Sequence, residues 1–202
     1  MGQVFRVAEQ YLPQLGSGEF VEIGTSRNGD DGSTRTLAEW AGQLGTHLTT
    51  VDMDPINCEF VQNLHIANCT VLNETGEDYL YHRIYSSHPI SLLYLDNFDW
   101  DWHPDRTEDF VVEQQQRYQA LGIEMTNVNS QAAHLRQMEI ALPHMAEQCL
   151  VVCDDTWYNR FWGHYSGKSG AVVPYLIAHG FDSLYTEEDP VYGTILGRGI
   201  RA

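Results

Sequence analysis

The chain has 202 residues, 43% of them hydrophobic and 11% aromatic, which provides enough apolar material for one globular domain over residues 1–202. Its 28 acidic and 11 basic residues give a formal net charge of −17. A surface this negative repels the phosphate backbone of nucleic acids and anionic membranes, so we expect neither as a partner.

The sequence also predicts a cytoplasmic protein. No stretch approaches the ~20 apolar residues that a membrane span requires, and the N-terminal residues lack the apolar core of a signal peptide. The four cysteines form no C-x-x-C pair, and buried free thiols are the expected state of Cys149 and Cys153. A homodimer is left open.

Strands and helices are predicted to alternate along the whole chain. Strands are expected over 19–23, 48–52, 70–72, 90–96, 150–153, 181–185 and 191–196, and helices over 33–44, 55–68, 78–83, 107–121, 130–142 and 171–179. The first helix has its apolar residues at helical spacing, at Leu37, Trp40, Ala41 and Leu44. This alternation predicts an α/β fold, a doubly wound and mainly parallel sheet with helices on both faces and antiparallel C-terminal strands.

Three predicted strands end in an acidic residue, at Asp52, Asp96 and Asp154. In doubly wound sheets, ligands bind at the carboxyl ends of the strands, near the point where the strand order reverses. We therefore expect the functional site at this edge of the sheet.

A glycine-rich segment, residues 22–34, follows the first predicted strand and leads into a helix; it contains Gly24, Thr25, Ser26, Gly32 and Ser33. Such segments let the backbone approach a ligand and direct N–H groups at it. The spacing is not G-x-G-x-x-G, and the acids at positions 30 and 31 would repel a pyrophosphate. A ligand with a cationic centre and one carboxylate fits better, and a tight turn with incidental glycines is the alternative.

Acids after the second and third strands complete a nucleoside-type pattern. An acid at the position of Asp52 accepts hydrogen bonds from ribose hydroxyls in doubly wound folds. Glu77 and Asp78 lie where a carboxylate would meet an adenine amino group. Helix capping explains the acids after strand three equally well, and it is also an alternative for Asp52 taken without the glycine-rich segment.

These features together resemble class I S-adenosylmethionine-dependent methyltransferases. The similarity rests on Glu-x-Gly at 22–24, the glycine-rich turn into a helix at 32–34, Asp52 and the acids after strand three. Segments 93–97, 151–156 and 167–176 resemble the small-molecule O-methyltransferases typified by macrocin O-methyltransferase and the cephalosporin-hydroxylase-like proteins. The resemblance covers most of the chain, from about Phe20 to Gly199.

The resemblance implies a Rossmann-like methyltransferase fold with S-adenosylmethionine as cofactor. It places Glu22 and Gly24 at the methionine end, Asp52 with Met53 at the ribose, and Glu77 or Asp78 at the adenine. Catechol-type relatives carry a lysine shortly after the acid that ends strand four. The only lysine here, Lys168, lies far downstream, so a lysine base of that kind is expected to be absent.

Asp96, Asp154 and Asp155 form a predicted metal site. Neighbouring parallel strands would bring these carboxylates together, and a hard cation such as Mg²⁺, Mn²⁺ or Ca²⁺ would relieve their mutual repulsion. The resemblance implies the same, because metal-binding relatives use an acid after strand four and an acidic pair after strand five. Helix capping, or a salt-bridge cluster around Arg160, is the alternative.

Asp96 and His103 are the predicted catalytic residues, and His134 and His164 are further candidate bases because imidazole titrates near neutrality. Aromatic residues crowd the nearby loops at Trp100, Trp102, 157–158 and 161–162. They suggest either a substrate lid or acceptor platform, or a satellite core under a long loop.

The predicted function is therefore an enzyme that transfers a methyl group from S-adenosylmethionine to an oxygen of a small polar acceptor, assisted by a divalent cation. Three alternatives remain open at this point. They are metal-independent N- or O-methylation on the same fold, a non-catalytic cofactor-binding protein, and a metal-dependent hydrolase. Cofactor affinity distinguishes the hydrolase from the others, and product formation distinguishes an enzyme from a binding protein.

Overall fold

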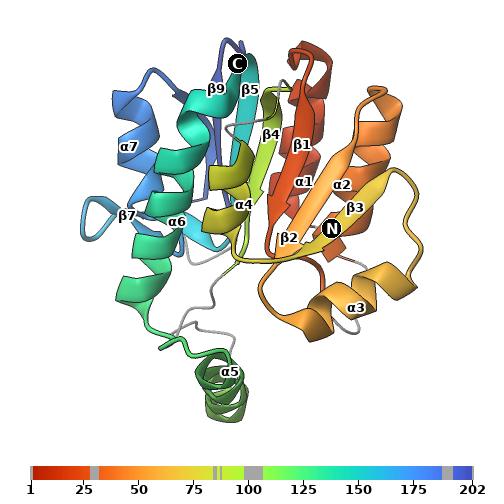
Figure 1. Ribbon diagram of the computed structural model, residues 1–202. Helices are drawn as coiled ribbons and strands as arrows, with labels where there is room; N and C mark the ends of the chain where they lie inside the picture. The colour runs from red at the N-terminus through yellow and green to blue at the C-terminus, as the bar shows by residue number, and fades with distance from the viewer. Residues whose placement is uncertain are drawn as a thin grey trace.

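A seven-stranded sheet forms the centre of the protein, which we describe from a computed structural model covering residues 2–27, 32–83, 86, 88–97, 107–187 and 193–201. The strands lie in the order β3-β2-β1-β4-β5-β9-β8, and β6 and β7 form a separate hairpin (Figure 1). Their bounds are β1 Glu19–Ile23, β2 Leu48–Asp52, β3 Cys69–Asn73, β4 Ile90–Leu95, β5 Met145–Cys153, β6 Thr156–Asn159, β7 His164–Gly167, β8 Asp182–Thr186 and β9 Thr194–Arg198. The first five sheet strands are parallel, whereas β9 pairs antiparallel with both β5 and β8. The predicted fold class is confirmed.

Helices cover both faces of the sheet (Figure 1). They are α1 Gln3–Ala8, η1 Glu9–Gln14, α2 Gly32–Gln43, α3 Pro55–Asn63, α4 Gly76–His82, α5 Glu108–Ala120, α6 Asn127–Ala141, η3 Leu142–His144 and α7 Val172–Ala178. Several begin at a side chain that accepts a hydrogen bond from the first helical turn, as Asp54, Thr75, Thr107 and Thr126 do. Each cap satisfies a backbone donor that the helix itself leaves unpaired, so these local choices set the helix starts.

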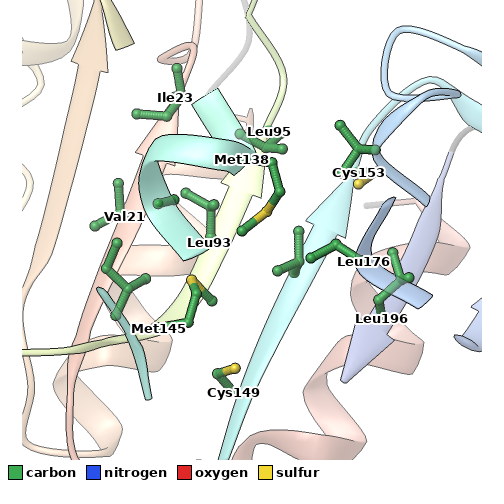
Figure 2. Close-up of a cluster of buried hydrophobic side chains, with 14 of the residues drawn as sticks. Val21, Ile23, Leu93, Leu95, Met138, Met145, Cys149, Cys153, Leu176 and Leu196 are labelled. Carbon is green, nitrogen blue, oxygen red and sulfur yellow. The ribbon is translucent and has the colours of Figure 1, made fainter. Parts of the chain in front are cut away.

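Alternate residues of the central strands pack into two separate cores. Val21, Leu93 and Val151 contact the layer of α4, α6 and α7, where Met138 and Leu176 lie (Figure 2). The residues one position along each strand, Phe20, Leu92 and Leu150 among them, face the other layer of α1, η1 and α2. Because strand side chains alternate between faces, a strand buried on both sides is apolar throughout, as the sequence of β4 predicted.

Some predicted boundaries differ from the observed ones. The helix predicted over 55–68 ends at Asn63, because His65 and Asn68 adopt left-handed backbone conformations that an α-helix cannot contain. Leu44, predicted in the apolar stripe of the first helix, lies beyond its last residue and is 43% exposed. Strand β5 begins five residues before its predicted start. The exposed Glu147 and Gln148 interrupt the apolar pattern, so the sequence indicated a strand only from Leu150 onward.

Among the described elements, α1, η1, η3 and the β6–β7 hairpin were not predicted. The four cysteines are free thiols, and Cys149 and Cys153 are buried as expected. Within the described residues, no helix combines the length and the apolar character needed to cross a bilayer.

Candidate active site

The carboxyl ends of β1, β2, β4 and β5 meet at one edge of the sheet. Each strand pairing extends one hydrogen bond past the strand ends. The backbone N–H groups of Gly24, Asp96 and Asp154 donate to the carbonyl oxygens of Val51, Ile23 and Leu95, respectively. The strand order reverses between β1 and β4, the position where doubly wound sheets bind ligands. The acids predicted to end strands therefore lie at one rim.

Gly24 forms a close backbone approach at this rim. Its φ of +97° favours glycine, and a Cβ atom here would lie 2.5 Å from the backbone nitrogen of Asn97. Any side chain at position 24 would fill the gap between the ends of β1 and β4. The glycine thus leaves open backbone for a ligand to pass across the switch point.

Asp52 is held at the end of β2 by three donors. Its Oδ1 accepts from the backbone N–H of Asp54 at 2.8 Å, and its Oδ2 accepts from the N–H of Thr25 and the Asn57 amide, both at 3.2 Å. Burial raises the pKa of this carboxyl, and the hydrogen bonds partly oppose the rise. A carboxylate can accept about four hydrogen bonds, so Asp52 retains capacity for one further donor.

The rim contains a cavity that we call the Asp52 cavity. It is lined by Asp52, Met53, Gly24, Asp96 and Asn97 from the strand ends, and by residues of α5. Asn97 Oδ1 is buried there and has no hydrogen-bond partner among the described residues. Arg117 of α5 donates to Asp54 and to Asn57 Oδ1, and so ties this helix across the opening.

A second cavity, which we call the Glu77 cavity, adjoins the first because both include Asp52, Met53 and Asn97. Its volume is about 180 Å³, and Glu77 lies on its wall. Glu77 Oε2 accepts from the Gln137 amide at 3.1 Å. Asp78, the other acid predicted at this end, accepts from the hydroxyl of Thr75, the N-cap residue of α4, and does not line the cavity.

A third cavity, the Phe5 cavity, opens on the side of α1 and α2 and has a volume of about 700 Å³. Phe5 and Tyr94 form its aromatic wall and pack at a tilt of 50°, with ring centroids 5.3 Å apart. The predicted cofactor residues Thr25, Ser26, Gly32 and Ser33 line it, together with Asp96, Asp154, Asp155, Lys168, Arg27, Arg35, Thr36 and Glu39. Asp96 therefore borders both this cavity and the Asp52 cavity.

Glu22, predicted at the methionine end, is completely buried and lines none of these three cavities. Its Oε2 accepts from the hydroxyls of Thr34 and Thr50, each at 2.6 Å. Thr34 Oγ1 in turn accepts from the backbone N–H of Ser26 at 2.9 Å, so Glu22 contacts the end of the glycine-rich segment directly and supports Ser26 through Thr34. Burial raises the pKa of Glu22 to about 7, against the lowering effect of the hydroxyl donors.

Asp96, Asp154 and Asp155 converge as predicted, with one carboxylate oxygen of each lying within 4.8 Å of the others. Lys168 lies far from Asp96 along the chain, which led us to expect no lysine base there, but the fold brings it to these acids. Lys168 Nζ donates to Asp96 Oδ1 at 2.6 Å and lies 2.9 Å from Asp155 Oδ2. Arg160, the base predicted as the alternative partner, is an exposed residue of the turn between β6 and β7.

The β6–β7 hairpin explains how a lysine so far along the chain reaches the rim. It begins directly after Asp155 and ends at Gly167, and the backbone N–H of Lys168 donates to the Asp155 carbonyl at 3.1 Å. A Cβ atom at position 167 would lie only 1.8 Å from that carbonyl oxygen, and φ is +92°. Only glycine fits there, and it lets the lysine return to the acids.

Burial and charge shift proton affinities inside the cluster. The pKa of Asp154 is raised well above its ordinary value by burial and by the negative charges of Asp96 and Asp155. The pKa of the Tyr94 hydroxyl is also raised well above its ordinary value, by burial and by the neighbouring acids. The Lys168 ammonium thus offsets part of the negative charge of Asp96 and Asp155, whereas the carboxyl of Asp154 resists ionisation.

Two of the histidines predicted as bases, His134 and His164, line none of the three cavities. His103 lies outside the described residues, and His164 is an exposed residue whose Nδ1 lies 3.3 Å from the Trp162 carbonyl. His134 is fully buried in α6, with Nδ1 2.7 Å from the Ser130 carbonyl. Burial lowers the pKa of His134 to about 4, so its imidazole is neutral near pH 7.

The loop aromatics divide between core and surface. Trp157 is buried, whereas Phe161 and Trp162 are 85% and 68% exposed at the end of the hairpin. None of these lines any of the three cavities, and Trp100 and Trp102 lie outside the described residues. The aromatic wall comes instead from Phe5 and Tyr94, which sequence reasoning missed.

Lys168 was also missed, although one signal pointed to it. It is the only lysine in a chain with 28 acids, and it lies in a segment that otherwise consists of small and apolar residues. A lone charge in such a segment has to find a partner when buried. No local pattern identifies that partner as Asp96, which is 72 residues away.

No protein-family model matches the chain, and no curated protein matches it either. Several solved structures do. A proposed rRNA-methylase from Clostridium thermocellum has a TM-score of 0.54 and 11% identity, with 98% of each chain covered. The N-methyltransferase NodS from Bradyrhizobium japonicum WM9, in complex with S-adenosyl-L-homocysteine, has a TM-score of 0.51 and 10% identity over 97% of this chain and 85% of its own.

A spermidine synthase in complex with the transition-state analogue AdoDATO has a TM-score of 0.55 and 9% identity. The match covers 98% of this chain but 61% of the synthase. At these identities the similarity shows the fold alone. The chain has the Rossmann-like fold that these S-adenosylmethionine-dependent methyltransferases share with spermidine synthase, and the narrower resemblance to macrocin O-methyltransferase stays a prediction.

Proposed function

We propose that the protein transfers a methyl group from S-adenosylmethionine to an oxygen of a small polar acceptor. The observation that carries this proposal is the continuity of the three cavities along one rim of a methyltransferase-type sheet. Asp96 borders both the Asp52 cavity and the Phe5 cavity, so one carboxylate would face cofactor and acceptor together.

The residues present fit this cofactor. Asp52 would accept from the ribose hydroxyls, and Glu77 from the adenine amino group. The buried, unpartnered Asn97 Oδ1 offers a further acceptor, and Gly24 leaves the space that a side chain would fill. The acids at the other end of the rim would attract a sulfonium cation.

The cofactor supplies an activated methyl group, so the chain's own residues have to align the acceptor and receive its proton. Asp96 is the proposed proton acceptor, because among the described residues it is the one carboxylate that borders both the Asp52 cavity and the Phe5 cavity. Lys168 holds Asp96 Oδ1 in place at 2.6 Å. Phe5 and Tyr94 would pack against the acceptor in the larger cavity and exclude water from it.

A divalent cation at Asp96, Asp154 and Asp155 was the predicted assistant, and the residues do not fit one in the arrangement described. The Lys168 ammonium already contacts two of the three carboxylates, and a charged lysine has no lone pair to offer a metal. We therefore derive no step through a metal ion.

An amine acceptor is the second candidate. Even with Asp154 protonated, the two carboxylates of Asp96 and Asp155 outweigh the single charge of the Lys168 ammonium, which favours a cationic substrate over an anionic one at this end of the rim. The solved structures of similar fold include an N-methyltransferase and a spermidine synthase. Hydroxyl and amine acceptors of matched size, each supplied with S-adenosylmethionine labelled in the methyl group, distinguish the two.

Calorimetric titration with S-adenosylhomocysteine tests the cofactor assignment. We expect saturable binding that weakens by about 1–3 kcal/mol in Asp52→Asn, the scale of losing charge-assisted hydrogen bonds. Asp182→Asn, which removes an exposed acid on β8, serves as the matched control and should bind like the wild type. No binding by the native protein at millimolar ligand would refute the proposal.

A further inference from the structure

The acidic rim contains its own cation. Lys168 is 1% exposed, and its ammonium lies at charge-assisted hydrogen-bond distance from Asp96 and Asp155. Oxygen atoms of three carboxylates that lie within 4.8 Å of one another are spaced like the ligands of a single divalent ion. The lysine contacts two of these three groups.

We propose that Lys168 is the resident cation of this rim, replacing the divalent ion that three converging aspartates would otherwise bind, so that the site works without metal. The catalytic part of this inference rests on the proposed function. The ion-binding part concerns the folded protein alone.

Charge and space both favour the lysine over a metal ion. A divalent cation needs oxygen ligands at about 2.0–2.6 Å, and the ammonium would be its immediate, repelling neighbour. Asp96 and Asp155 would have to give up their contacts with Lys168 before they could coordinate an ion. The displaced ammonium would then be buried without its carboxylate partners, which is strongly unfavourable.

The hairpin keeps the lysine in position. The Lys168 N–H donates to Asp155, and on the next residue the Ser169 N–H donates to Thr156 Oγ1 at 3.0 Å. Gly167 packs closely against the Asp155 carbonyl, so the backbone before and after Lys168 is held against the start of the hairpin. The side chain therefore cannot leave the acids through a simple rotation of an exposed loop.

Lys168 is thus a positioning residue that acts through Asp96 and Asp155. It orients Asp96, the carboxylate that borders both cavities, and it neutralises charge that would otherwise push the acids apart. A metal ion would perform both tasks in a metal-dependent rim. Here a side chain performs them permanently.

Ion binding tests the inference directly, with Mn²⁺ as the probe and its electron paramagnetic resonance signal as the readout. We expect no saturable binding to the wild type at about 1 mM, and binding by Lys168→Ala with a Kd on the order of 10⁻⁴ M. Adding Asp154→Asn to Lys168→Ala should weaken that binding at least about tenfold. Lys168→Met, which keeps the apolar stem, provides a second variant should Lys168→Ala not fold.

Two results would overturn the inference. One is wild-type protein that binds Mn²⁺ in this range and loses the binding in Asp155→Asn. The other is a folded Lys168→Ala or Lys168→Met protein, checked by circular dichroism, that binds no more Mn²⁺ than the wild type. Neither result depends on methyl transfer.

Turnover provides the second test. Wild-type activity should be unchanged in excess EDTA, and Lys168→Ala should lose about 10²-fold in kcat while its affinity for S-adenosylhomocysteine changes little. Methylammonium or Mg²⁺ should restore part of the activity, which neither would do if Lys168 served only folding. EDTA inactivation of the wild type that Mg²⁺ reverses would contradict the inference, whereas cofactor binding without any methyl transfer would refute only the proposed function.

Discussion

Replacing Glu22 by glutamine should change the pH dependence of stability by a predictable amount. Glu22 is completely buried, and its pKa is raised from 4.5 to about 7, which corresponds to about 3 kcal/mol at roughly 1.4 kcal/mol per pKa unit. The folded carboxyl keeps its proton where the unfolded one has lost it. The free energy of unfolding therefore falls as pH rises from 4.5 to 7.

The measurement compares urea unfolding of wild type and Glu22→Gln at pH 5 and pH 8. Because glutamine does not titrate, the variant should gain about 2–3 kcal/mol relative to the wild type between these two pH values. His134 changes the free energy of unfolding in the opposite direction. Because burial lowers its pKa to about 4, its contribution to stability rises as pH increases from 4 to 6.5. Taking the difference between variant and wild type removes that contribution.

Glu147→Gln is the matched control, because it removes an exposed carboxyl from β5 and should leave the pH dependence unchanged. If Glu22→Gln follows the wild type in parallel from pH 5 to pH 8, the buried, protonated state of Glu22 is refuted.

Three further outcomes are expected. Gly167→Ala should lower the free energy of unfolding by more than about 2 kcal/mol, because its Cβ would lie 1.8 Å from the Asp155 carbonyl oxygen. Gly122→Ala is the control for backbone strain alone, because Gly122 has a φ of +77° and a Cβ atom there would meet nothing within 4 Å. Equal losses in the two variants would contradict the close approach. Lys168→Met should cost about 3–5 kcal/mol in denaturant unfolding by leaving buried carboxylates unpaired, and a loss below about 1 kcal/mol would argue against the ion pairs. With a net charge of −17, the protein should give no gel shift with rRNA fragments at about 150 mM salt, and a micromolar shift would instead reveal a segregated basic surface.

The local pattern of the chain was sufficient for most of the fold. The predicted ranges of β1 and β2 match the structure to the residue, and β4 differs only at its last position. These strands are buried on both faces, and in β4 the nearly continuous apolar run signals strand and burial at once. The acids that follow them were also placed correctly at one rim, because the strands are parallel and end at the same edge of the sheet.

Tertiary structure alone decided which groups meet there. Local sequence cannot tell that Lys168 pairs with Asp96, because 72 residues separate them and Lys168 reaches the rim at the end of a hairpin without a strong strand pattern. The same holds for Glu22, whose partners Thr34 and Thr50 come from two other elements. Whether converging carboxylates require a metal ion depends on which cation the fold brings within about 3 Å, and periodicity along the chain carries no such information.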